Sequence, residues 1–188
     1  MAATEPLFSV CVFCGSRDGN DPKYLEDAKN LGGALGRRGM RLVYGAGDVG
    51  IMGAVAKAAQ EAGAQTLGII PTHLMQLEVA KRDLGALIIT ENMHERKKVM
   101  FMNSDAVVVL PGGAGSLDEF FEVLTWAQLG LHEKPVILVN TNGYWDKLVD
   151  LIDHVIESGF ASPSLKAHFH TVDSVEAALS VITDAQVG

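Results

Sequence analysis

"VVVLPGGAGSLDEFFEVLTWAQLG", residues 107–130, predicts a buried strand, a glycine-rich turn and a helix in direct succession. The strand is an uninterrupted apolar run, which is typical of strands covered on both faces in a parallel sheet. The turn contains Gly112, Gly113 and Gly115 and ends where the helical pattern begins. A strand that passes through such a turn into a helix is the repeating unit of doubly wound α/β folds.

The same alternation of apolar strands and helices extends over most of the chain. Strands are expected at residues 7–14, 41–45, 65–70, 86–90, 105–111 and 135–140. Helices are expected at 22–38, 50–62, 93–103, 116–129, 144–158 and 173–183. The sequence therefore predicts one Rossmann-like α/β domain over residues 1–188, with a doubly wound, mostly parallel sheet and helices on both of its faces.

The composition excludes several classes of partner. The formal net charge is -8 and no lysine- or arginine-rich block stands apart, which disfavours a surface for nucleic acid. The apolar runs are too short to span a bilayer, so no membrane partner is expected. No basic segment precedes the apolar run near the N-terminus, so we expect a cytoplasmic location rather than secretion. A small nucleotide stays possible because it needs only a local site.

The two cysteines, Cys11 and Cys14, form a C-x-x-C pattern within the first expected strand. Such a pair is compatible with redox or metal chemistry, or with two small buried side chains. Strand residues three apart face opposite sides of the sheet, and no second cysteine pair completes a zinc site. We therefore predict two buried strand residues and no metal or cofactor.

Three expected strand ends carry glycine or hydroxyl residues, and ligands of doubly wound sheets bind beyond such ends. After the first strand, "CGSR" offers Gly15 and Ser16; Ser16 is equally suited to contact a ligand or to cap the next helix. After the second, "GAGDVG" at 45–50 matches a dinucleotide pattern, but the next strand lacks the acidic residue that NAD binding requires. Close packing, or a lining role of Gly45 and Gly47 around a nucleotide, is the better interpretation.

The third strand end, "PGGAGS" at 111–116, is the strongest anion-site candidate. Glycines leave the backbone N–H groups accessible, and the following helix presents its positive dipole end. No lysine follows the glycines, so the loop differs from a P-loop. The candidate phosphate-binding residues are Gly112, Gly113, Ala114, Gly115 and Ser116.

Glu119 follows this loop and allows two interpretations. Ser116 and Glu119 have the spacing of a capping box, with Ser116 as the N-cap. Alternatively, Glu119 is a functional carboxylate beside the bound anion. Asp118 lies about 100° around the helix from Glu119, so the two carboxylates do not share a target.

The stretch "NMHERKKVMFMNSD" supplies the opposite charge. Met93, Arg96 and Met100 share one helix face, so Arg96 either snorkels past the core or points into a polar cleft. Lys97 follows Arg96 and lies about 100° further around the helix. A phosphate and a carboxylate about 6 Å apart repel by about 3 kcal/mol at an effective dielectric constant of 20, and these cations would offset that repulsion.

"MHERK" at 93–97, followed by "PGGAGSLDE" at 111–119, resembles the LOG ("Lonely guy") family of cytokinin riboside 5′-monophosphate phosphoribohydrolases, formerly labelled lysine decarboxylase-like. The resemblance covers residues from about 8 to 160. It implies a Rossmann-like homodimer, with the cleft near the subunit interface, that hydrolyses the N-glycosidic bond of N6-modified adenosine monophosphates without a cofactor.

The resemblance also implies roles for individual residues. Arg96 and Glu119 correspond to the catalytic pair, and Lys97, the loop 112–116 and Thr125 to nucleotide-binding positions. Glu78 corresponds to a glutamate that contacts substrate. The chain departs from the family pattern at Ala46, Asp48 and Ser116, which bears on base preference more than on chemistry; Ser116 retains the hydroxyl of the usual threonine.

Three other functions compete with hydrolysis. The first is a non-catalytic carrier of a nucleotide or of molybdenum cofactor, which the Arg96–Glu119 pair disfavours. The second is a lysine decarboxylase, which needs pyridoxal phosphate on a lysine, yet no lysine occupies a phosphate-loop context. The third is a scaffolding dimer, which would leave the polar cleft unused.

Overall fold

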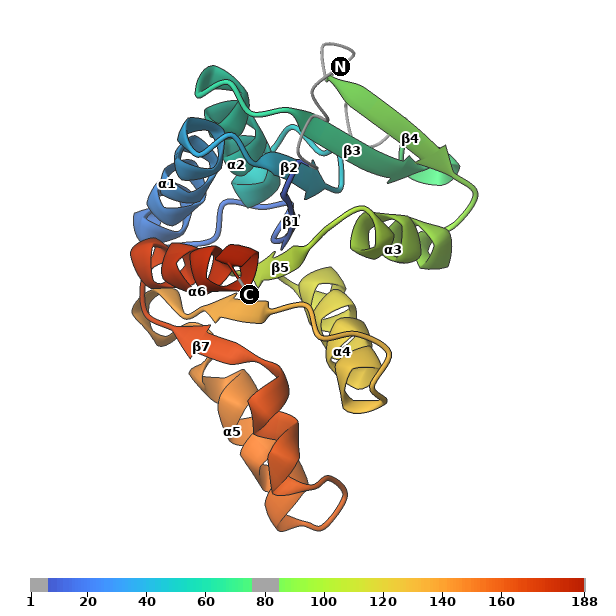
Figure 1. The fold of residues 1–188 in the computed structure, drawn as a ribbon, viewed down its shortest axis with the longest axis vertical. Coiled ribbons are helices and arrows are strands. Elements are labelled where there is room, and N and C mark those ends of the chain that lie inside the picture. The colour runs from blue at the N-terminus through green and yellow to red at the C-terminus, as the bar shows by residue number, and fades with distance from the viewer. Residues whose placement is uncertain (1–6, 76–84, 188) are drawn as a thin grey trace.

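The computed structural model describes residues 7–75 and 85–187. Within these residues, seven strands form one sheet in the order β4-β3-β2-β1-β5-β6-β7, and every neighbouring pair is parallel (Figure 1). The strands are β1 Ser9–Phe13, β2 Arg41–Tyr44, β3 Thr66–Pro71, β4 Ala86–Thr90, β5 Ala106–Val109, β6 Val136–Val139 and β7 His170–Val172.

Helices cover both faces of this sheet and enclose two apolar cores. One core contains residues of α1 (Pro22–Arg37), α2 (Gly50–Glu61) and α6 (Val175–Val187). The other contains residues of α3 (Met93–Met102), α4 (Ala114–Gln128) and α5 (Asp146–Glu157). The central strands β1, β2, β5 and β6 contribute alternate side chains to the two cores, because successive side chains of a strand point to opposite faces.

The predicted doubly wound α/β fold is confirmed, and the sheet is parallel throughout. The six expected strands and six expected helices are present, with ends shifted by at most a few residues. The sequence did not reveal β7, which is three residues long and exposed at the sheet edge. A short edge strand that begins with histidine and threonine lacks the apolar run that marks the buried strands.

The two cysteines lie where strand alternation predicts them. Both thiols are free and buried; Cys11 packs in the core that faces α4, and Cys14 in the core that faces α1. Burial raises the pKa of the Cys11 thiol well above its usual range. None of the described helices has the length and apolarity that a membrane crossing needs.

The strand order places a crevice at the ends of β1 and β5. From β1 the chain moves outward through β2, β3 and β4, then returns to pair β5 with the other side of β1. Doubly wound sheets bind ligands at such a reversal, beyond the carboxyl ends of the strands. The loops that follow these two strands are joined by a hydrogen bond from the Gly15 N–H to the Pro111 carbonyl, at 3.0 Å.

Candidate active site

A pocket of about 410 Å³ lies at these carboxyl ends and collects most of the residues that the sequence singled out. The loop after β1, the loop after β5, α3 and α4 all contribute to its wall. Its lining residues are Cys14, Gly15, Ser16, Arg17, Met52, Leu74, Met93, Arg96, Gly113, Ala114, Gly115, Ser116 and Glu119.

The glycine loop brings bare backbone to this pocket. Helix α4 begins at Ala114, with Gly113 as its N-cap. The first N–H groups of a helix have no acceptor within the helix, so residues 114–116 present donors at the pocket wall. A Cβ atom on Gly113 or Gly115 would meet nothing within 4 Å, whereas one on Gly112 would collide with the Ser116 hydroxyl. The loop is thus closely packed on one side and open on the other.

The capping-box interpretation of Ser116 is wrong. The helix begins two residues before Ser116, which is therefore its third residue and is buried against the loop. Gly113 supplies the extended cap conformation (φ −98°, ψ −152°) without a side-chain hydrogen bond. Glu119 is consequently the sixth residue of α4, beyond the first turn, and lines the pocket.

Arg96 does not snorkel to solvent. Its side chain is buried, its Nε donates to the Ile69 carbonyl at 3.1 Å, and its Nη2 donates to the Gly45 carbonyl at 2.5 Å. These carbonyls belong to β3 and to the end of β2, so the sheet itself holds the guanidinium in the pocket wall. Gly45 cannot carry a side chain here, because a Cβ atom would overlap with the Arg96 guanidinium.

The charges of Glu119 and Arg96 act on a common neighbour. Burial raises the pKa of the Cys14 thiol far above its usual range, the Glu119 carboxylate raises it further, and Arg96 opposes the rise. Cys14 is therefore a protonated thiol in the pocket wall and not a nucleophile. The opposite electrostatic effects place the carboxylate and the guanidinium around one point at the end of β1.

The loop at 45–50 is closely packed against the neighbouring backbone. The first amides of α2 are taken by protein carbonyls, since Ile51 N donates to Arg17 O at 3.4 Å and Met52 N to Gly15 O at 3.1 Å. Gly47 N faces the Met52 sulfur at 3.2 Å. Gly45 and Gly47 are not among the residues that line the pocket, whereas Met52 is.

Ala46, in the same loop, has a backbone conformation that favours glycine. Its φ is 63°, in the left-handed region that favours glycine, and its side chain is buried. Alanine at position 46 is therefore held in a backbone conformation that glycine adopts more easily.

Lys97 and Thr125 are not among the residues that line the pocket. The Lys97 ammonium contacts Asp118 at 2.8 Å and also pairs with Glu122, so it joins α3 to α4. Thr125 is exposed, and its hydroxyl donates to the Phe121 carbonyl at 2.7 Å. Glu78 lies outside the described residues.

Lys97→Met is expected to lower the free energy of unfolding by about 1–3 kcal/mol, because it leaves the two carboxylates without their buried cation. Urea denaturation followed by circular dichroism measures the change. The neighbouring exposed Lys98→Met is the matched control and should stay within about 0.5 kcal/mol of the wild type. An unchanged stability combined with weaker nucleotide binding would instead support direct contact between Lys97 and the ligand.

Five lining residues were not selected from the sequence: Cys14, Arg17, Met52, Leu74 and Met93. Arg17 is exposed, follows the glycine and serine of the β1 loop, and lines the pocket. A basic residue directly after a glycine–serine pair at a strand end was the available signal. The other four are apolar side chains or a thiol, which carry no such signal.

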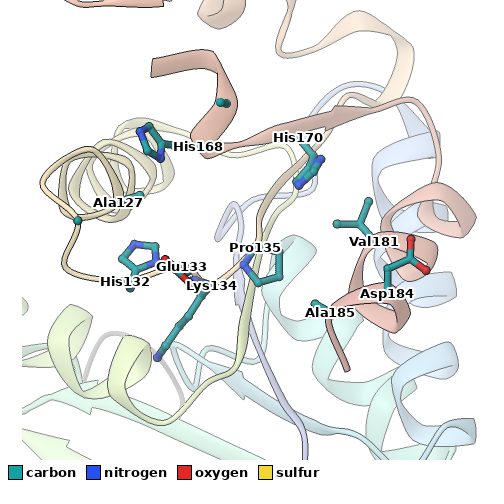
Figure 2. Close-up of a pocket in the computed structure, with 12 residues that line it drawn as sticks. Ala127, His132, Glu133, Lys134, Pro135, His168, His170, Val181, Asp184 and Ala185 are labelled. Atoms are coloured by element: carbon teal, nitrogen blue, oxygen red, sulfur yellow. Dashed lines mark hydrogen bonds between the residues drawn. The ribbon is translucent and has the colours of Figure 1, made fainter. Parts of the chain in front are cut away.

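A second pocket of about 660 Å³ lies at the opposite, amino-terminal ends of the strands, where β6 and β7 begin (Figure 2). It contains none of the predicted site residues, and two of its polar side chains, those of His132 and Lys134, have structural partners. The two ring nitrogens of His132 contact Val123 O at 2.9 Å and Lys134 N at 3.1 Å, and the Lys134 ammonium donates to Phe101 O at 2.8 Å. We therefore assign the candidate active site to the smaller pocket.

Comparisons with known proteins show which proteins the chain resembles. A family model described as "Possible lysine decarboxylase" matches residues 52–182. The chain is 42% identical over 180 residues to the probable cytokinin riboside 5′-monophosphate phosphoribohydrolase LOG4 of Oryza sativa subsp. japonica, covering 96% of this chain and 78% of that protein. It is 47% identical over 164 residues to the cytokinin riboside 5′-monophosphate phosphoribohydrolase LOG7 of Arabidopsis thaliana, covering 87% and 76%.

Among solved structures, the Moco carrier protein from Chlamydomonas reinhardtii superposes with a TM-score of 0.73 at 21% identity, covering 97% of this chain and 99% of that one. At this identity the likeness shows a shared fold and nothing more specific.

Proposed function

The chain belongs to the LOG family of cytokinin riboside 5′-monophosphate phosphoribohydrolases, and from this membership we propose that it hydrolyses the N-glycosidic bond of N6-modified adenosine 5′-monophosphates, with AMP as a further candidate substrate. The products are the free base and ribose 5-phosphate. The observation that carries the proposal is the single pocket in which Arg96, Glu119 and the glycine loop meet.

The glycine loop is the proposed phosphate site. The accessible backbone at Gly113 and Gly115, the first amides of α4 and the Ser116 hydroxyl supply neutral donors, and the helix dipole favours an anion there. Arg17 adds a positive charge at the same wall. Gly15 and Ser16 close the pocket on the β1 side. This set binds a phosphate without a P-loop lysine or a metal ion.

Glu119 is the proposed catalytic carboxylate. Hydrolysis breaks the bond between the ribose C1′ and the base nitrogen, forms a bond from C1′ to a water oxygen, and transfers a proton to the departing base. The transition state of such a reaction resembles an oxocarbenium ion. A carboxylate beside the ribose stabilises that positive charge and accepts a proton from water.

Arg96 is the second member of the proposed catalytic pair. Its two bonds to backbone carbonyls leave the guanidinium little freedom, so it presents a fixed positive charge to the pocket. We assign it the orientation of Glu119 and of the leaving base. As the glycosidic bond breaks, its electron pair moves onto the departing base, and a fixed cation stabilises that developing negative charge until the base is protonated.

We also propose that the protein is a homodimer. Support comes from the resemblance to the family and from exposed apolar side chains on and after α4, namely Phe121, Leu129 and Leu131. Light scattering on the purified protein tests this, and a mass equal to the monomer's would contradict it.

The proposed specificity is tested by offering the protein AMP and N6-isopentenyladenosine monophosphate in parallel, with chromatography of the released bases. Release of adenine alone would restrict the substrate to AMP. Tight binding of the nucleotides without release of any base would favour a carrier function over an enzyme. A yellow colour from bound pyridoxal phosphate would revive the decarboxylase interpretation.

A further inference from the structure

Tyr144 contacts the glycine loop from outside the pocket. Its hydroxyl donates a hydrogen bond of 2.5 Å to the Gly112 carbonyl, although the two residues are 32 positions apart in the chain. Tyr144 follows the short 3-10 segment Thr141–Gly143 after β6 and is not one of the residues that line the pocket. Any effect of Tyr144 on a ligand must therefore pass through Gly112.

The peptide group that joins Gly112 to Gly113 transmits this contact. In a trans peptide the C=O and the N–H point in opposite directions. With the Gly112 carbonyl directed at Tyr144, the Gly113 N–H is directed to the other side of the loop, and Gly113 lines the pocket. We propose that Tyr144 is a positioning residue that holds this peptide so that the Gly113 N–H faces the substrate phosphate; the inference rests on the proposed function.

The loop needs such an external support because its own residues do not fix it. Gly112 and Gly113 have no side chains, and glycine has more backbone freedom than any other residue. Gly113 has open space around the position where a Cβ would lie, so packing does not restrain it on the ligand side. One hydrogen bond to the intervening carbonyl selects one orientation of the peptide and thereby prepares the site before a ligand arrives.

Tyr144 is itself held in place. Its ring packs edge-to-face against Tyr24, with centroids 5.4 Å apart, and against Trp145, with centroids 4.7 Å apart. Two residues before it, Asn142 donates to Asp21 at 2.7 Å, which ties the turn to the start of α1. The hydroxyl is therefore placed by contacts that do not involve the loop.

Tyr144→Phe tests the inference, because it removes the hydroxyl and keeps the ring contacts. The expected result is a 3- to 10-fold weaker competitive inhibition by ribose 5-phosphate and a similar rise in KM for the nucleotide, about the loss expected for one hydrogen bond. The kcat and the inhibition by the free base should stay within about 2-fold of the wild type, because neither involves the phosphate.

Tyr24→Phe is the matched control. It removes a hydroxyl from the other member of the same aromatic pair, and among the described residues this hydroxyl donates nothing to the loop. Its inhibition constants should equal those of the wild type. Tyr144→Phe could also lower the melting temperature. In that case amide hydrogen exchange, measured below the unfolding transition, must be accelerated at residues 112–116 more than in the rest of the chain.

Two results would overturn the inference while leaving the proposed function intact. One is an active wild type whose Tyr144→Phe variant binds ribose 5-phosphate equally well. The other is equal weakening of ribose 5-phosphate and free base, which would mean general damage to the pocket. A wild type that binds neither nucleotide nor ribose 5-phosphate would remove the proposed function and this inference together.

Discussion

A substrate without its 5′-phosphate is expected to react about 10⁴-fold more slowly in kcat/KM, because the donors built for the phosphate would be left without an acceptor. Those donors are the first amides of α4, the accessible backbone at Gly113 and Gly115, and the Ser116 hydroxyl. The backbone donors are held by the start of α4 and by the contact of the loop with Tyr144, so they do not turn away to find other acceptors. The riboside therefore loses binding and the positioning of its ribose beside Glu119.

The measurement compares kcat/KM for N6-isopentenyladenosine monophosphate with that for the same riboside lacking phosphate. Adding ribose 5-phosphate as a competitor provides the internal control, since it should inhibit hydrolysis of the monophosphate. Comparable kcat/KM values for the two substrates would contradict the assignment of the phosphate site to the glycine loop.

Replacing Glu119 by glutamine is expected to lower kcat by about 100-fold or more, the usual contribution of a positioned acid–base group. The amide has nearly the same shape but carries no charge, so it neither stabilises an oxocarbenium ion nor accepts a proton. Because Glu119 is beyond the first turn of α4, the loss of its charge should change helix capping little. The KM should change less than kcat if the carboxylate acts mainly in the transition state.

The exposed Glu157→Gln on α5 serves as the control for removing a helical carboxylate, and its kcat should match the wild type. Nearly normal turnover by Glu119→Gln would leave the carboxylate with no catalytic role. Nucleotide binding by this variant, measured by calorimetry, shows that its pocket is intact.

The sequence predicted the fold because the buried strands are continuous apolar runs that alternate with helical stretches. It placed Arg96 on the same helix face as Met93 and Met100, and left open whether the guanidinium snorkels to solvent or enters a polar cleft. It did not predict what holds the guanidinium, because the Gly45 and Ile69 carbonyls meet it only through the pairing of β2 with β3. Every residue has a backbone carbonyl, so the sequence does not show which carbonyls accept hydrogen bonds from a side chain.

The start of α4 was missed for a related reason. Ser116 and Glu119 have the spacing of a capping box, whereas the true cap is Gly113, which has no side chain to reveal the role.

The contacts of Lys97 could not be predicted because they depend on the packing of two helices. The position of this lysine beside Arg96 indicated a shared anion, but its partners Asp118 and Glu122 lie on a different helix, and only the packing of α3 against α4 brings them together.

The most direct test of the central claim is the product analysis of purified wild-type protein incubated with N6-isopentenyladenosine monophosphate alone. Free isopentenyladenine and ribose 5-phosphate are expected in equal amounts, with no riboside and no inorganic phosphate. Release of inorganic phosphate and riboside would show that the phosphate ester is cleaved in place of the glycosidic bond. That outcome, or an unchanged nucleotide, would contradict the claim that Arg96, Glu119 and the glycine loop form a phosphoribohydrolase site.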